Sequence, residues 1–462
     1  MSRFVFVLGL TAGLAAPVAA QHHPAPTDSS AHAGHAPPAH DHAAMAHGAM
    51  DHGMGSALSP SAPMAVDGSG TSWLPAASPM EMVHAKAGGW HLMAHGAITP
   101  RLKGSDLFDA GSRGSDVAAD APNWLMGMAQ RPLGEGLQLT ARLMVSADPI
   151  TEGGAGYPLL FQSGETYQGE RLVDRQHPHD LVAEASVALA ARLGERAAAF
   201  GYVAYPGEPA LGPTAFMHRP AARFDADAPL SHHWQDATHI AWGVATAGVV
   251  VGPLKLDGSV FTGAEPDEDR YTPDRARFDS YSARLSWSPT DRWTLQVSRG
   301  FLREPETIEP GVDVWRTTAS ALYAQPLTGG DLTATLAWGV NEHVEDHDAA
   351  SDDDHHGGLQ HALLAEAALR RGPWAVFGRG EVTQKSGAEL ALDGDLGEAV
   401  HTVGAISLGG ARRVARVAGL DAMLGIQATT YAVPDDLRPV YGDVPVSGQV
   451  FLRIAPSQRT GR

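Results

Sequence analysis

The chain has 462 residues, no cysteine and a formal net charge of −19 at pH 7. The lack of cysteine excludes disulfides and thiolate metal sites, while the acidic balance disfavours nucleic acid as a partner and suits cations. With 52 glycines and many alanine-rich segments, the composition favours short strands and turns over a few large helices.

The first twenty residues have the pattern of a secretory signal peptide. A basic start at Arg3 precedes an apolar run from Phe4 to Leu14, and small residues up to Ala20 fit a cleavage site. No later stretch reaches the roughly 18 uninterrupted apolar residues that a membrane helix needs. We therefore expect a chain exported by a Gram-negative bacterium, either soluble or inserted in a membrane as a barrel.

Residues 21–72 form a low-complexity segment rich in His, Met, Ala, Pro and Gly. Because it lacks the apolar residues needed for a core, we expect a disordered periplasmic tail before a second domain at 73–462. Thioether sulfur suits Cu(I), and imidazole suits Cu(II) and zinc, so residues 21–60 are predicted to bind copper at several weak sites. The alternative is a His-rich linker with incidental affinity. The candidate ligands are His42, Met45, His47, Met50, His52 and Met54.

From about Trp90 onward, apolar and polar residues alternate as they do in strands. In the clearest case, Tyr281, Leu285 and Trp287 share one face, and polar residues occupy the other. We predict an all-β chain of about sixteen antiparallel strands (14–16). They lie near 90–102, 123–133, 136–148, 179–194, 196–207, 238–252, 254–265, 279–290, 293–302, 314–327, 331–343, 360–372, 373–385, 398–413, 415–433 and 447–456.

Tight turns and long polar loops alternate between these strands, which is typical of bacterial outer-membrane barrels. The even strand count predicts both termini in the periplasm and the loops at 149–178, 206–237 and 344–359 outside the cell. Tryptophans near tight turns, Trp287, Trp293 and Trp374, fit an interfacial aromatic girdle, although ordinary core positions are the alternative.

The loop after the eleventh strand is rich in carboxylates and imidazoles. Such a mixture fits Zn or Cu(II), and a solvated acidic loop is the alternative interpretation. The candidate ligands here are His343, His347, His355 and His356.

Two histidine pairs lie in loops on the same side of the predicted barrel: His177 with His179, and His232 with His233. Their loops follow the third and fifth strands and flank one hairpin, so their bases are neighbours, with strands about 4.8 Å apart. We predict that the four imidazoles meet at the outer mouth, where they could hold one divalent ion. Asp174, Asp180 or Asp236 would then orient the rings. The alternative is a hydrogen-bonded plug without metal.

No enzyme signature is present in the sequence: it contains no G-x-S-x-G, P-loop or H-E-x-x-H motif. We therefore predict that the protein is not an enzyme.

Several ordered-looking motifs resemble a family of uncharacterised bacterial outer-membrane proteins. The motifs are 70–75, 123–126, 164–167, 174–180, 205–213 and 231–233, and the resemblance covers roughly residues 68–305. It implies an outer-membrane barrel and assigns no biochemical role. Separately, the tail at Met45–Met54 is similar to the Met/His repeats of the outer-membrane copper-resistance protein B family, which implies copper as a ligand.

Two main functions follow from these observations. The first is a barrel that binds or passes transition-metal ions, with copper preferred over zinc and with periplasmic metal-handling partners for the tail. The second is a general porin or solute channel with an incidental His-rich tail, since sixteen strands leave room for an aqueous lumen. A structural or adhesive surface protein is a third class.

Overall fold

The computed structural model describes residues 55–109, 112–345 and 358–458. Residues Met50–Arg462 form one compact unit, and Met1–Ala49 form a separate unit that lies outside the described residues. Among the described residues, no helix combines the length and the apolar character that crossing a membrane requires.

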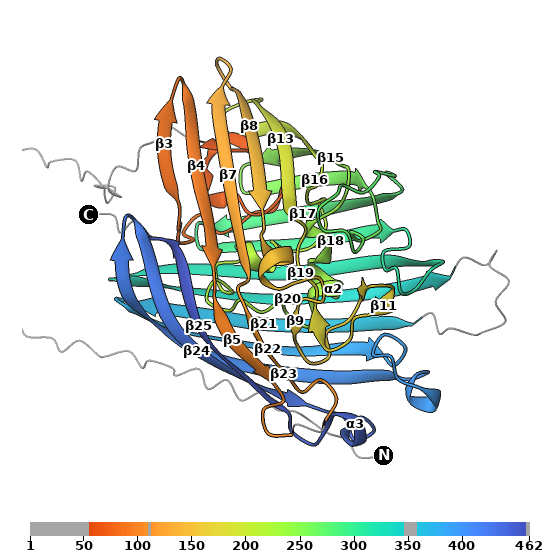
Figure 1. Ribbon diagram of the computed structural model, residues 1–462. Helices are drawn as coiled ribbons and strands as arrows, with labels where there is room; N and C mark the ends of the chain where they lie inside the picture. The colour runs from red at the N-terminus through yellow and green to blue at the C-terminus, as the bar shows by residue number, and fades with distance from the viewer. Residues whose placement is uncertain (1–54, 110–111, 346–357, 459–462) are drawn as a thin grey trace, which may run out of the picture. The chain divides into compact units, whose positions relative to one another are not determined.

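The described residues form a closed antiparallel β-barrel (Figure 1). Its strands are β4 (Trp90–Ile98), β5 (Arg101–Ser105), β6 (Asp116–Asp120), β7 (Asn123–Pro132), β8 (Leu137–Val145), β13 (Val182–Arg192), β14 (Ala197–Ala204), β15 (Val244–Val251), β16 (Leu254–Phe261), β17 (Ser280–Thr290), β18 (Trp293–Leu302), β19 (Val312–Leu327), β20 (Gly330–Glu345), β21 (Leu359–Arg371), β22 (Trp374–Ser386), β23 (Val400–Val417), β24 (Leu420–Ala432) and β25 (Val446–Pro456).

Prolines interrupt the first two strands of the wall. Pro100 separates β4 from β5, and Pro122 separates β6 from β7, because proline cannot donate to the strand ladder. Each pair is therefore one interrupted strand, and the described wall has sixteen strands, as predicted. The sequence interpretation missed one further strand, β3 (Val83–Ala87), which forms a hairpin with β4. The wall closes where β25 pairs with β5.

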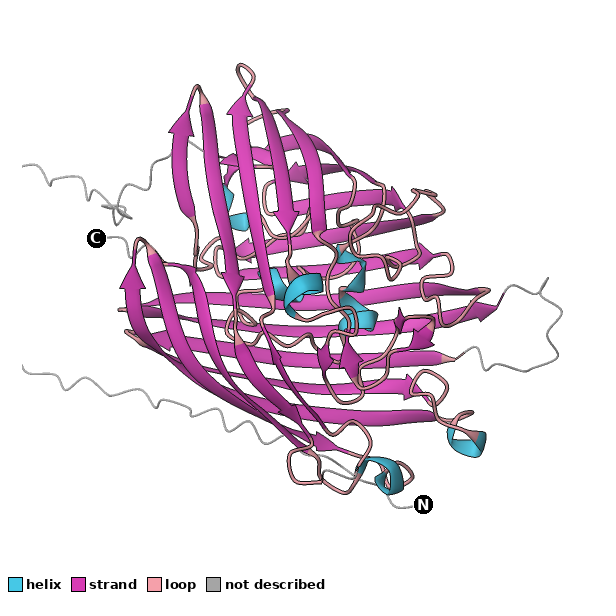
Figure 2. Cartoon of the chain, in the orientation of Figure 1, coloured by secondary structure: helices cyan, strands magenta, loops and turns pink. Residues whose placement is uncertain are grey.

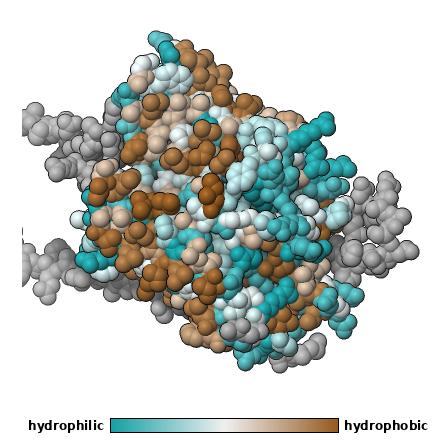
Figure 3. Space-filling model, in the orientation of Figure 1, coloured by the Kyte–Doolittle hydropathy of each residue, from teal (hydrophilic) through white to brown (hydrophobic). Residues whose placement is uncertain are grey.

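The two faces of each strand differ sharply. In β21, exposed and buried residues alternate along its whole length, with leucine and alanine dominating the exposed positions. Buried positions on the same strand include Glu366 and Arg370. Figure 3 shows hydrophobic residues over the wall and hydrophilic residues gathered toward the end with the long loops. An apolar exterior around a charged interior is the pattern of a barrel that spans the outer membrane.

Aromatic side chains lie on the exterior near both ends of the wall. Trp287, Trp293 and Trp374 are 46%, 41% and 58% exposed, so they are not core residues. Near the opposite end of the same strands, Tyr281 packs on Phe301 at a ring distance of 5.6 Å. The exterior positions fit the predicted interfacial girdle.

Tight turns and long loops alternate as predicted, and the long loops carry the short elements (Figure 2). These elements are α1 (Asp148–Thr151), β9 (Tyr157–Pro158), β10 (Thr166–Tyr167), β11 (Glu170–Arg171), β12 (Arg175–Gln176), η2 (Phe216–His218), α2 (His232–Gln235), η3 (Ala237–His239), η4 (Gly394–Leu396) and α3 (Arg438–Tyr441).

Two chain segments fill the lumen, which we name the inner segment (residues 55–78) and the inner loop (residues 205–243). The inner segment contains β1 (Gly55–Ser56), β2 (Ser59–Pro63) and η1 (Met64–Val66). Residues 55–72, which the sequence analysis assigned to the disordered tail, therefore belong to the described barrel interior. Polar wall residues hold this segment, since Gln130 and Gln138 donate to the carbonyls of Gly55 and Ser56, at 3.0 and 2.6 Å. Apolar contacts hold it as well, because Leu58 and Trp73 pack in a buried cluster with residues of β13, β14 and β15.

Candidate functional site in the barrel lumen

The inner loop crosses the lumen and is anchored to two separate parts of the wall by buried ion pairs. Arg219 donates to Glu366 on β21 at 2.7 Å and also pairs with Asp236 of the same loop. Farther along the loop, Asp227 lies 2.6 Å from both Arg101 and Lys103 on β5. Because each buried carboxylate has a cationic partner, the loop is held as a fixed part of the interior.

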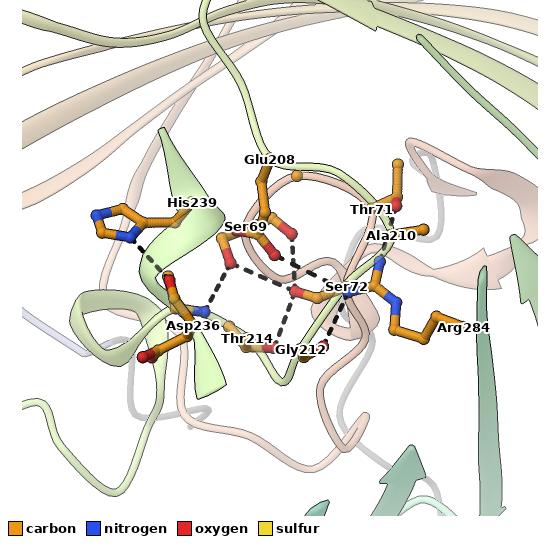
Figure 4. Close-up of polar contacts among 12 residues, drawn as sticks. Ser69, Thr71, Ser72, Glu208, Ala210, Gly212, Thr214, Asp236, His239 and Arg284 are labelled. Atoms are coloured by element: carbon orange, nitrogen blue, oxygen red, sulfur yellow. Dashed lines mark hydrogen bonds and ion pairs between the residues drawn. The ribbon is translucent and has the colours of Figure 1, made fainter. Parts of the chain in front are cut away.

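The inner segment and the inner loop are also joined to each other by hydroxyl groups (Figure 4). Thr214 donates to the Ser72 hydroxyl at 2.9 Å, and the Ala215 amide donates to the Ser69 hydroxyl at 2.9 Å. Arg284 on β17 donates to the Thr71 hydroxyl at 2.8 Å and to the Gly212 carbonyl at 3.2 Å, which ties both segments to the wall.

Five histidines come together between the inner loop and the loop that precedes β13. We call His177, His179, His232, His233 and His239 the histidine cluster. Ring centroids lie 6.4 Å apart for His177 and His233, 5.3 Å for His179 and His239, and 5.1 Å for His232 and His239. The predicted proximity of the two histidine pairs is confirmed by these distances.

Three rings of the cluster are oriented through the nitrogen Nδ1. His179 Nδ1 contacts the Asp148 carboxylate at 2.7 Å, and His232 Nδ1 contacts the Asp236 carboxylate at 2.8 Å. His239 Nδ1 contacts the backbone carbonyl of Asp236 at 2.9 Å (Figure 4). The Nε2 atoms of His179 and His239 are buried and have no hydrogen-bond partner.

Burial lowers the pKa of His232 and lowers that of His239 more strongly. Both rings are therefore neutral near pH 7, and each keeps one nitrogen lone pair.

His177 and His233 instead face carboxylates. His177 Nε2 lies 3.1 Å from Glu165, and His233 Nδ1 lies 3.3 Å from Glu265 and 3.5 Å from Glu306. Burial opposes the charged form of His233, but the two glutamates outweigh it and raise the pKa of His233 to about 10. The ring is therefore cationic at neutral pH, and its nitrogens carry protons.

An acidic pocket, which we name the vestibule, lies beside the cluster at the loop end of the barrel. Its volume is about 400 Å³, and its lining in the described chain includes no Lys or Arg. The five carboxylates that line it are Glu165, Glu265, Asp267, Glu268 and Asp269.

Two smaller cavities lie next to the vestibule, between the inner loop and the loop that precedes β13. A cavity of about 20 Å³ shares Glu165 and Glu265 with the vestibule and is also lined by His179, His232 and His239. The next cavity, of about 60 Å³, shares His177 and His179 with it. The three spaces therefore adjoin in series, with the histidine cluster between the two larger ones.

Of the other predicted metal ligands, the structure describes His343 alone, and it does not join this cluster. His343, at the end of β20, lies 4.0 Å from Glu309. His42, Met45, His47, Met50, His52 and Met54 of the tail, and His347, His355 and His356 of the loop, lie outside the described residues. Sequence reasoning did not select His239 or Asp148, although His239 follows Asp236 by only three residues.

No protein-family model matches the chain, and no curated protein matches it. Among solved structures, the chain is similar to Salmonella typhi OmpF in complex with daunomycin, with 11% identity, 80% of this chain and 100% of that chain covered, and a TM-score of 0.48. It is also similar to an anion-selective porin from Comamonas acidovorans, with 11% identity, 79% and 99% covered, and a TM-score of 0.47. For the outer membrane channel DcaP of Acinetobacter baumannii, the values are 10%, 80%, 98% and 0.44. The likeness is one of fold alone.

Proposed function

We propose that this outer-membrane barrel is a narrow channel for small solutes that favours cations. The observation that carries the proposal is the row of adjoining cavities that begins at the vestibule. Two of its five carboxylates are paired, Glu165 with Arg270 and Glu265 with His233. The other three, Asp267, Glu268 and Asp269, form no ion pair with a basic side chain in the described residues, and they create a negative potential that concentrates cations at the entrance. The inner loop and inner segment fill much of the lumen, so we expect a small conductance rather than that of a wide pore.

Current recordings test this function. The refolded full chain is inserted in planar bilayers under a KCl gradient, and the zero-current potential is measured. We expect small conductance steps and a potential with the sign set by potassium. Neutralising the vestibule with D267N/E268Q/D269N should move that potential toward zero. A control, D395N/D435N/D443N, removes three exposed loop carboxylates that do not line the vestibule and should leave it unchanged. Anion preference, or no current, contradicts the proposal.

A second candidate function, the handling of transition-metal ions, is favoured by the histidine cluster. Five imidazoles gathered beside an acidic pocket suit borderline divalent cations. The Met/His tail would capture copper before it reaches the barrel. We expect a peptide of residues 21–60 to bind Cu(I) and Cu(II) with several weak sites in a titration. A stoichiometry near zero in a non-chelating buffer would remove the tail from this function.

A further inference from the structure

We propose that His179, His232 and His239 bind one divalent transition-metal ion inside the barrel. The site is the cavity of about 20 Å³ between the inner loop and the loop before β13. A cavity of this size holds one water molecule or one ion. The proposal deepens the metal-handling function and is independent of ion conduction.

The spacing of the rings is that of ligands to a shared ion. Metal–nitrogen bonds of about 2.0–2.1 Å in a tetrahedral site place two imidazole centroids roughly 5 Å apart. His239 lies in the middle of the set, with ring distances of 5.3 Å to His179 and 5.1 Å to His232. The loops that carry these residues follow different strands, so an ion would join the inner loop to the loop before β13.

The hydrogen bonds of the three rings match the requirement for metal ligation. A metal-binding histidine usually donates its second ring N–H to a carboxylate or a carbonyl, which fixes the ring and directs the other nitrogen to the ion. Here all three Nδ1 atoms have such a partner, from Asp148 or Asp236. Both carboxylates are themselves fixed, since Asp148 also accepts from the Asn123 amide at 2.8 Å and Asp236 pairs with Arg219. The buried Nε2 atoms of His179 and His239 are then the free donors.

A fourth ligand is present in the same cavity. The Asp180 carboxylate lines it, and its oxygen Oδ2 is buried without a hydrogen-bond partner. Arg270, which also lines the cavity, lies 3.9 Å from that oxygen and would have to yield it to the ion. Three imidazoles and one carboxylate, with no sulfur donor, suit zinc, cobalt(II), nickel(II) or copper(II) rather than copper(I).

The other two histidines of the cluster have a different role. His177 Nε2 faces Glu165, and His233 Nδ1 faces Glu265 and Glu306, so these two nitrogens are occupied by carboxylates. Glu165 and Glu265 also line the vestibule, through which a cation reaches the site.

Binding requires small side-chain rotations. In the part of the chain that the structure describes, no three His, Asp or Glu groups already converge as a complete ligand set. The three Nε2 atoms must therefore turn toward the cavity centre about their side-chain bonds.

Zinc-dependent stability of the refolded full chain tests the site. An ion that binds only the folded barrel raises its unfolding temperature, whereas binding to the tail has no such linkage. We expect ZnCl₂ to raise the temperature at which the barrel unfolds. Each of the variants H179A, H232A and H239A should weaken zinc binding by more than about tenfold, judged by competition with a chelator. The control H361A changes an exposed histidine on the outer face of β21 and should bind as the parent does.

Cobalt(II) gives a second readout that needs no variant, because its visible bands report tetrahedral nitrogen and oxygen ligands. The folded parent chain should show such bands after weakly bound metal is removed by a mild chelator, and H47A/H52A in the tail should keep them. The site is refuted if the parent shows no zinc-dependent stabilisation or no cobalt bands, or if H239A folds and retains both. Bilayer currents on the same preparation decide the channel function separately.

Discussion

Carboxylates gather in two regions of this barrel, the vestibule and the inner loop. The two regions differ in how many of these carboxylates form ion pairs with basic side chains. In the described residues, no basic side chain forms an ion pair with Asp267, Glu268 or Asp269 of the vestibule. The inner loop instead pairs its buried acids with arginine or lysine, as Arg219 does for Asp236. Unpaired charge at an entrance attracts mobile ions, whereas paired charge in the interior holds the chain in position.

The orientation of the barrel in the membrane should give the largest difference between the vestibule and the opposite end of the barrel, measured as cysteine labelling on intact cells. The sequence contains no cysteine, so single cysteines can be introduced without background labelling. On intact cells we expect an impermeant maleimide to label D269C in the vestibule and not D291C in the tight turn after β17. Both positions are exposed in the structure. Labelling of D291C alone would reverse the predicted orientation.

The variant R219A should strongly destabilise the inner loop. It leaves Glu366 and Asp236 buried with one cationic partner fewer, which costs about 3–5 kcal/mol for a broken buried pair. We expect a lower urea midpoint by tryptophan fluorescence and a larger conductance, because the loop is released from the lumen. The control R416A removes a partly exposed pair with Asp421 and should cost at most about 1 kcal/mol. Equal effects of the two variants would contradict this role of the inner loop.

Glu208 in the inner loop makes stability depend on pH. Burial raises the pKa of Glu208 to about 8, although Arg284 lies 3.9 Å away and lowers it. The folded state therefore binds a proton that the unfolded chain releases near pH 4.5. The contribution of this bound proton to the free energy of unfolding is complete below pH 4.5 and is lost as the pH rises through about 8.

The variant E208Q should remove this dependence and stabilise the barrel at pH 8–9 by on the order of a few kcal/mol. Urea midpoints at pH 5 and pH 9 measure the effect. The control E268Q, in the vestibule, should keep the slope of the parent chain. An unchanged slope in E208Q would show that this carboxyl is already ionised.

The smallest expected effect is that of the vestibule on stability. The variant D267N/D269N should change the free energy of unfolding by no more than about 0.5 kcal/mol, since both side chains are exposed. Urea titration in detergent measures this value. A loss comparable to that of R219A would mean that the vestibule carboxylates hold the loops, as those of the inner loop do.

The strands could be predicted because their signal is local. Alternation of apolar and polar residues, together with turn length, gave the correct number of wall strands, sixteen, although β6 and most of β5 lay outside the predicted ranges. The inner segment could not be found in this way, since its apolar residues are few and scattered, and the wall residues that hold it lie far away in the sequence. Arg142, for example, donates to the Gly70 carbonyl at 2.6 Å.

The histidine cluster could also be predicted only in part. Loop order alone predicted that His177 and His179 would meet His232 and His233. It could not distinguish His177 and His233, which face glutamates, from His179 and His239, whose Nδ1 atoms are hydrogen-bonded to Asp148 or Asp236, because that depends on side-chain direction. For the same reason it could not select His239, whose position depends on the short turns α2 and η3.

The pairing of β25 with β5 has a consequence for the order of assembly. These strands come from opposite ends of the barrel sequence, so bringing them together carries the largest loop-closure cost of any seam in the wall. The inner segment precedes β5 in the chain and lies inside the finished wall. A closed cylinder offers the segment no lateral entry, so after the last seam has formed it can enter only along the barrel axis. Sealing the wall around the segment needs no such passage and is therefore the expected last step of folding.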